Sequence, residues 1–315
     1  VLFQPGLNED LAATAIWGSQ QAELRGEGKH DGVFALWYGK GPGVDRAGDA
    51  LKHGNAYGSS PNGGVLVVAG DDHGCVSSSM PHQSDVAFMA WFMPTLNPAN
   101  VAEYLAFGEW GYALSRFSGM WVGFKAISET VESAASVELR PDRVFALPDF
   151  TPPPGGLHYR WPDLPGPQIE ERMEAKKQAV FAFADANPID RHIYDVKDAR
   201  FGIVTTGKGH LDLMEALRLL GIGEAECREL GIDIYKVGMV WPLFQAAGPE
   251  AADESGYAEF EEVMIRQRNK TMASKAAPFL GEGNSFIAVG ALHLPGEEGL
   301  VALLRKAGYT VTPAG

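Results

Sequence analysis

Residues 4–21 read QPGLNEDLAATAIWGSQQ, and this stretch organises the first part of the chain. Pro5-Gly6 predicts a turn, Asn8 is a favourable N-cap, and Glu9 then falls in the first turn of a helix. The helix is rich in small residues, which allow its backbone to approach a sheet or another subunit closely: Ala12, Ala13, Ala15, Gly18 and Ser19. We therefore expect Glu9 at the mouth of a closely packed helix rather than out in solvent.

Two interpretations of Glu9 are open. An acidic residue in the first turn suits the positive end of the helix dipole and needs no further role. The other interpretation comes from a resemblance: the stretch is similar to the pyrimidine-binding domain of the thiamine-dependent 2-oxoacid:ferredoxin oxidoreductases, and most of all to the long bacterial indolepyruvate ferredoxin oxidoreductases. In that family, the acid of the Asn-Glu pair hydrogen-bonds the aminopyrimidine ring of thiamine pyrophosphate. The resemblance implies that Glu9 is the catalytic acid and that Asn8 and Glu9 bind the cofactor.

Cofactor chemistry explains why the family needs a carboxyl group there. A glutamic acid that shares a proton with the pyrimidine favours its imino tautomer, which can then take the proton from the thiazolium carbon. A shielded site suits this carboxyl group, because desolvation favours its neutral form.

The composition excludes several classes of function. The chain has 315 residues, a formal net charge of −14 and a pI near 5.0, so it offers no electrostatic footprint for nucleic acid. Cys75 and Cys227 are too far apart in sequence to suggest a zinc site, and two cysteines cannot ligate an iron–sulfur cluster. With no apolar run long enough for a membrane and no signal peptide, we expect a cytoplasmic protein without membrane or nucleic-acid partners.

Apolar strands that alternate with helical patterns predict an α/β fold with parallel sheets. The expected divisions are a pyrimidine-binding-type thiamine domain without its N-terminal part (1–139), a Pro-rich linker (140–167), an α/β domain that resembles the transketolase C-terminal type (168–243), a junction (244–254) and a small α/β tail (255–315). The clearest strand is 64–70, and a strand–helix–strand unit is expected over 201–237.

A polar loop follows the strand 64–70. Gly70-Asp71-Asp72-His73 and three later serines lie where ligands collect in parallel sheets, and the family resemblance implies that Gly70, Asp71 and Asp72 bind the cofactor. The alternatives are a hydrogen-bonded turn and a metal site of Asp71, Asp72 and His73, although consecutive side chains point in different directions. The glycine-rich loop 39–43 lacks the ending of a nucleotide-binding loop, and the resemblance places it near the active site.

The last part of the chain resembles a different family. Residues 255–313 are similar to the C-terminal end of the TraB/GumN (Tiki-like) family, whose members are proposed metal-dependent peptidases. Arg268 matches the arginine of that family, and Gly290-Ala291-Leu292-His293 matches the second of its two Gly-x-x-His motifs. His293 is therefore a candidate metal ligand, but one histidine does not make a metal site, and a helix-capping histidine is the alternative.

Our leading hypothesis is part of a thiamine-pyrophosphate-dependent oxidoreductase that converts a 2-oxoacid, such as indolepyruvate or another arylpyruvate, into an acyl-CoA. The resemblance implies a site for thiamine pyrophosphate with magnesium that is shared with a domain this chain lacks. Iron–sulfur clusters and coenzyme A are implied only for the complete enzyme. We expect other domains or subunits as partners, a homo-oligomer, and no activity from this chain alone.

Two other hypotheses remain open, and with them the question of whether the chain is an enzyme at all. The tail suggests a fragment of a metal-dependent peptidase, and the helix of small residues suggests a non-catalytic interaction subunit. Under all three hypotheses, the sequence resembles parts of two unrelated families that are joined near residue 245.

Overall fold

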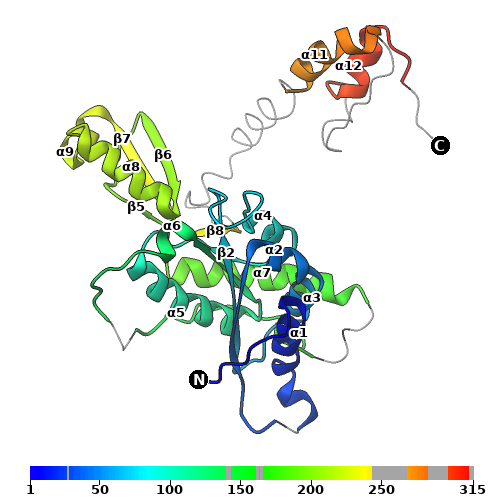
Figure 1. Ribbon diagram of the computed structural model, residues 1–315, viewed down its shortest axis with the longest axis vertical. Helices are drawn as coiled ribbons and strands as arrows, with labels where there is room; N and C mark the ends of the chain where they lie inside the picture. The colour runs from blue at the N-terminus through cyan, green and yellow to red at the C-terminus, as the bar shows by residue number, and fades with distance from the viewer. Residues whose placement is uncertain are drawn as a thin grey trace. The chain divides into compact units, whose positions relative to one another are not determined.

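Figure 1 shows the computed structural model of the chain, which describes residues 1–26, 28–139, 143–160, 163, 166–242, 268–282 and 297–311. The chain divides into two compact units, Val1–Phe244 and Gln245–Gly315.

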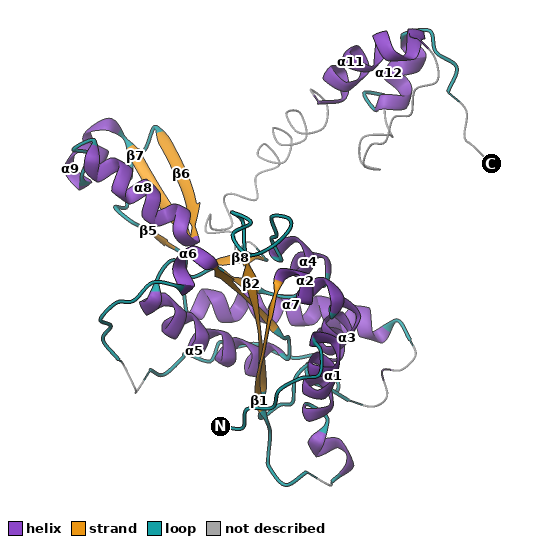
Figure 2. Cartoon of the chain, in the orientation of Figure 1, coloured by secondary structure: helices purple, strands orange, loops and turns teal. Residues whose placement is uncertain are grey.

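The first unit is built on a five-stranded sheet with the order β1-β2-β4-β3-β8 (Figure 2). Its strands are β1 (Phe34–Lys40), β2 (Gly64–Asp71), β3 (Thr95–Leu96), β4 (Val122–Ile127) and β8 (Met239–Trp241). The first four strands are parallel, and β8 runs antiparallel to β3. Val65 and Val67 of β2 enter one core while Leu66 between them enters the other, so this strand is buried on both faces, as in a parallel sheet covered by helices. The predicted α/β class is confirmed.

Four helices cover one face of the sheet: α1 (Glu9–Ser19), α2 (Gly41–Arg46), α3 (Gly48–Tyr57) and α4 (Asp85–Ala90). Their core contains Ala13 of α1, which is fully buried and packs in the same cluster as Trp37 of β1. The small side chain of Ala13 allows the close approach that the sequence predicts for α1. A short 3-10 helix, η1 (Ala22–Arg25), leads from α1 toward β1.

The other face of the sheet is covered by α5 (Val101–Ser118) and α7 (Gln168–Ala186). Trp110 and Leu114 of α5 are fully buried with Phe183 of α7, and the Trp110 and Phe183 rings meet edge to face at 5.3 Å. The short α6 (Ser128–Val131) follows β4.

A smaller three-stranded sheet has the order β5-β7-β6. It contains β5 (Arg191–His192), β6 (Phe201–Thr206) and β7 (Ile232–Val237), with α8 (Gly207–Leu219) and α9 (Glu224–Leu230) between β6 and β7. β6 and β7 are parallel, as the strand–helix–strand order predicts. This sheet has its own small core of Leu217, Cys227 and Ile234.

The two cores do not divide at the boundary expected from the sequence. Residues of α7 complete the core of the first sheet, and β8 adds a strand to its edge, so the range 168–243 contains elements of both cores. The Pro-rich segment before α7 is also anchored, because buried Asp163 forms ion pairs with Arg160 and with Arg172 of α7. Within the described residues of 168–242, those around β5, β6 and β7 form a core of their own.

The described part of the second unit consists of α11 (Arg268–Glu282) and α12 (Leu300–Lys306). Asn269 of α11 donates a hydrogen bond of 2.9 Å to the carbonyl oxygen of Glu298, and Lys270 pairs with the Glu298 carboxylate at 2.9 Å. The candidate ligand His293 lies outside the described residues. Among the helices that the structure describes, none is long and apolar enough to cross a bilayer.

Candidate functional site

The polar residues singled out in the sequence meet at the carboxyl ends of β1, β2 and β4. The parallel register pairs Lys40 with Gly70 and Asp71 with Ile127, so these three strands end side by side. The edge formed by their carboxyl ends is where ligands bind in open α/β sheets.

Glu9 is placed at this edge by the first turn of α1. Asn8 has extended backbone angles, and its side chain accepts a hydrogen bond of 2.9 Å from the Leu11 amide, which caps the helix. The indole nitrogen of Trp37 donates to the Glu9 carbonyl oxygen at 3.0 Å and ties the helix start to β1.

The Glu9 side chain lies against the first turn of α2, because residues 39–43, expected to form a loop, end β1 and begin this helix. A Cβ atom at Gly43 would lie 2.7 Å from Glu9 Cγ and 3.1 Å from Glu9 Oε1, so glycine is what leaves room for this carboxylate. No hydrogen bond or ion pair within the described part of the chain engages the carboxylate oxygens. Glu9 is only half-buried, so its carboxylate is available to a ligand.

Asp71, Asp72 and His73 point to three separate partners. The fully buried Asp71 carboxylate accepts hydrogen bonds from the Ser84 amide at 2.8 Å and the Ser84 hydroxyl at 2.7 Å. Nδ1 of His73 lies 3.0 Å from the His82 carbonyl oxygen. In the described ranges, no group of three or more His, Cys, Asp or Glu side chains is arranged to hold a metal ion.

Asp72 turns back into its own loop. Its carboxylate accepts hydrogen bonds from the amides of Ser77 at 2.8 Å and Val76 at 2.9 Å, and these bonds lower the pKa of Asp72. Gly70 pairs with Lys40 of β1, and a Cβ there would make an ordinary contact, 3.4 Å from the Gly39 carbonyl oxygen. Asp72 therefore has a structural role in this loop, whatever it binds.

Lys125 belongs to the same site, although it was not among the site residues predicted from the sequence. Its ammonium lies 3.0 Å from the Asp85 carboxylate and 3.9 Å from that of Asp71, and its side chain is almost fully buried. Lys125 is the only charged residue in the β4 sequence VGFKAI. A single cation in an otherwise apolar strand is rarely buried without a partner, so the sequence alone could have identified Lys125 as a candidate.

His82 and Lys40 fasten the loop 72–82 over the ends of β1 and β2. Nε2 of His82 lies 2.8 Å from the Asp45 carboxylate of α2, and its ring packs against Gly41, where any side chain would collide with it. Lys40 of β1 donates to the Ser77 hydroxyl at 3.0 Å. These contacts join residues 37 positions apart, and no local pattern in the sequence predicts them.

Comparisons with known proteins give a mixed result. A model of the TraB/PrgY/gumN family matches residues 206–313, about a third of the chain. This match begins at the end of β6 rather than at residue 255, and it continues across the boundary between the two compact units. The search of curated proteins returned no match.

Among solved structures, the chain is similar to a 2-oxoglutarate:ferredoxin oxidoreductase from Magnetococcus marinus, determined with 2-oxoglutarate, coenzyme A and succinyl-CoA bound. The alignment covers 81% of this chain at 13% sequence identity, with a TM-score of 0.49. The present chain spans 47% of the length of that protein, or about half.

Proposed function

We propose that the first unit contributes the pyrimidine-side half of a thiamine pyrophosphate site in a 2-oxoacid oxidoreductase, with Glu9 as the acid. The observation that carries the proposal is the position of Glu9. Its unengaged carboxylate lies against Gly43 in the first turn of α2, at the carboxyl edge of a parallel sheet. This edge is a common ligand site in such sheets, and a planar nitrogen heterocycle is a suitable partner for the carboxylate.

The residues of the edge fit the pyrimidine half of the cofactor. Glu9 would hold a proton against a ring nitrogen, and the loop 72–82, fastened by Lys40 and His82, would exclude water from that contact. Thiamine pyrophosphate, when bound, supplies a carbon nucleophile for the carbonyl group of a 2-oxoacid.

The diphosphate and its magnesium ion do not fit residues of this chain. The sequence contains no Gly-Asp-Gly…Asn motif, and the described residues contain no metal-binding group. We therefore propose that another domain or subunit, with residues that this chain lacks, completes the site, and that the chain is also part of a homo-oligomer. The complete enzyme would hold the iron–sulfur clusters and coenzyme A, and it would select an arylpyruvate such as indolepyruvate as its substrate. This chain alone is inactive.

Tryptophan fluorescence tests the proposal, because Trp37 is bonded to the Glu9 backbone. Titration with thiamine pyrophosphate and magnesium should give a saturable change in the full chain, and Glu9→Gln should abolish it. Asp10→Asn, one residue further along the helix, is the matched control and should bind as the unmodified chain does. Equal binding by Glu9→Gln would show that Glu9 does not contact the cofactor.

A second candidate function concerns the C-terminal part of the chain, and the family match over residues 206–313 favours it. We propose that this part derives from a metal-dependent peptidase of the TraB/GumN type, with His293 as a metal ligand. Titration with zinc or manganese should then show binding that His293→Ala removes. If neither ligand class binds, the remaining proposal is a non-catalytic interaction subunit.

A further inference from the structure

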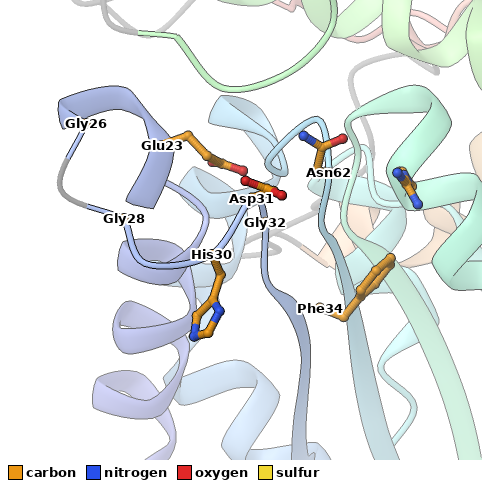
Figure 3. Close-up of a pocket in the computed structure, with 9 residues that line it drawn as sticks. Glu23, Gly26, Gly28, His30, Asp31, Gly32, Phe34 and Asn62 are labelled. Atoms are coloured by element: carbon orange, nitrogen blue, oxygen red, sulfur yellow. The ribbon is translucent and has the colours of Figure 1, made fainter.

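A hollow of about 620 Å³ opens at the amino ends of β1 and β2, at the opposite edge of the sheet from Glu9 (Figure 3). Its volume is in the range of small-molecule sites. Five of the side chains that line it carry a charged group or an aromatic ring: Glu23, His30, Asp31, Phe34 and Arg116. The described lining of the hollow shares no residue with the Glu9 site, so a ligand here does not depend on the proposed function.

The acidic wall consists of two carboxylates that converge. Figure 3 shows the side chains of Glu23 and Asp31 pointing toward one another. Glu23 accepts a hydrogen bond from the hydroxyl of Ser60, which is only 1% exposed, so this carboxylate is anchored to the protein core. In the described structure, Asp31 has no hydrogen-bond or ion-pair partner. Two carboxylates that line one hollow favour a cationic ligand there.

An ammonium group suits this position better than a metal ion. The described residues contain no set of three or more His, Cys, Asp or Glu side chains that could hold a metal, and the described lining of the hollow supplies one pair of carboxylates. An ammonium needs fewer ligands, because it offers three hydrogen-bond donors and can keep part of its water shell.

Arg116 supplies positive charge to the same hollow. It lies in the last turn of α5, where Nε2 of His158 lies 2.7 Å from its carbonyl oxygen and fixes its backbone. No contact within the described ranges engages its exposed guanidinium group, and it does not form an ion pair with Glu23 or Asp31. A free guanidinium is a good bidentate partner for a carboxylate.

Phe34 adds an apolar surface at the start of β1. Its side chain is 51% exposed, and its ring meets Tyr112 edge to face at 5.4 Å, which fixes its orientation. An aromatic ring in this position can contact the apolar part of a ligand, or an ammonium group that lies over the face of the ring.

We propose that this hollow is a binding site for a small zwitterion of the amino-acid class. Glu23 and Asp31 receive its ammonium group, Arg116 receives its carboxylate, and Phe34 contacts its side chain. The combination of an anionic wall, an unpaired guanidinium and an exposed ring in one hollow carries this assignment.

Ligand-observed NMR titration of the full chain tests the proposal with three probes that share one skeleton. L-phenylalanine has both charged groups, 2-phenylethylamine lacks the carboxylate, and 3-phenylpropionate lacks the ammonium. We expect saturable binding of L-phenylalanine, with each of the other two probes about tenfold weaker or more, because each loses one charge-assisted contact.

Variants assign the two walls separately. Asp31→Asn should weaken L-phenylalanine about tenfold while leaving 3-phenylpropionate unchanged, and Arg116→Gln should weaken it about tenfold while leaving 2-phenylethylamine unchanged. The matched controls are Asp198→Asn and Arg46→Gln, which are exposed residues outside the hollow and should bind normally. Unchanged tryptophan fluorescence shows that each variant is folded.

Two results would overturn the proposal. One is the absence of saturable binding of L-phenylalanine up to about 10 mM, which is beyond the range of a weak specific site. The other is equal binding of L-phenylalanine and 2-phenylethylamine together with no effect of Arg116→Gln, which would mean that Arg116 does not receive a carboxylate.

Discussion

Lys176 of α7 provides the sharpest prediction about stability. Its side chain is fully buried, and its ammonium donates to the carbonyl oxygens of Asn55 at 3.3 Å and Ala56 at 3.0 Å, at the end of α3. Burial, and then repulsion from Arg172, lowers the pKa of Lys176 well below its usual value. These contacts fasten α7 to the first sheet, so the titration of this one group tests whether α7 belongs to that core.

The sign of the pH dependence follows from this depressed pKa. Between the folded and the unfolded pKa of Lys176, the unfolded chain binds more protons than the folded chain, so the free energy of unfolding rises with pH. The rise approaches about 1.4 kcal/mol per pH unit and ends near the unfolded pKa of about 10.4. In Lys176→Met this contribution is absent.

Urea unfolding at several pH values from neutral upward, followed by tryptophan fluorescence, measures the effect. All seven tryptophans lie in the unit Val1–Phe244, so the signal reports this unit alone. The neighbouring Lys177, which is partly exposed and pairs with exposed Glu174 at 2.7 Å, is the matched control, and Lys177→Met should keep the slope of the unmodified chain. If the unmodified chain and Lys176→Met show the same slope, Lys176 is not buried as a depressed-pKa amine and the packing of α7 on α3 is wrong.

Three further predictions concern the carboxyl edge of the sheet. Asp71→Asn should lower the free energy of unfolding by about 2 kcal/mol in the same fluorescence assay, because the buried charge that accepts the Ser84 hydrogen bonds and faces Lys125 is lost. Asp72→Asn should speed cleavage within residues 73–81 in limited proteolysis at neutral pH. The unmodified loop should become similarly sensitive only when the pH falls below about 4, since the lowered pKa of Asp72 means that its stabilising contacts are lost on protonation. Gly43→Ala should weaken thiamine pyrophosphate binding about tenfold or more, with a change of less than about 1 kcal/mol in unfolding free energy, because the new Cβ displaces the flexible Glu9 side chain and not the backbone. Unchanged cofactor binding in this variant would count against the position proposed for Glu9.

Local patterns were sufficient to predict the elements of the parallel sheets. The apolar run 64–70 became β2, the N-cap at Asn8 starts α1, and the strand–helix–strand pattern over 201–237 forms β6, α8 and β7. Apolar periodicity and helix capping depend on residues that are close in sequence, so both can be recognised without knowledge of the tertiary structure.

Assignment of elements to a core could not be made from the same patterns. The period of α7 predicts a helix, but it does not say that Phe183 packs on Trp110 of α5. β8 has three residues, too few for a periodic signal, and it joins the first sheet only through its pairing with β3. Both assignments depend on contacts between residues far apart in the sequence.

In the candidate site, too, the sequence predicts the residues at element boundaries but not the contacts between distant residues. The sequence identified Glu9 and Asp71 because each stands at the boundary of a predicted element. His82 and Asp45 are adjacent only because the loop 72–82 folds over α2. Lys125 could have been recognised as a buried cation in an apolar strand, but its partners Asp71 and Asp85 could not.

The most direct test of the central claim is an NMR measurement on thiamine pyrophosphate that is labelled with ¹⁵N at its pyrimidine ring and exocyclic amino nitrogens. Our account predicts that the full chain, with magnesium present, shifts a pyrimidine nitrogen resonance, that Glu9→Gln removes the shift, and that Asp10→Asn preserves it. An identical shift with Glu9→Gln, or none with the unmodified chain at saturating protein, would contradict the assignment of Glu9 as the pyrimidine-binding acid.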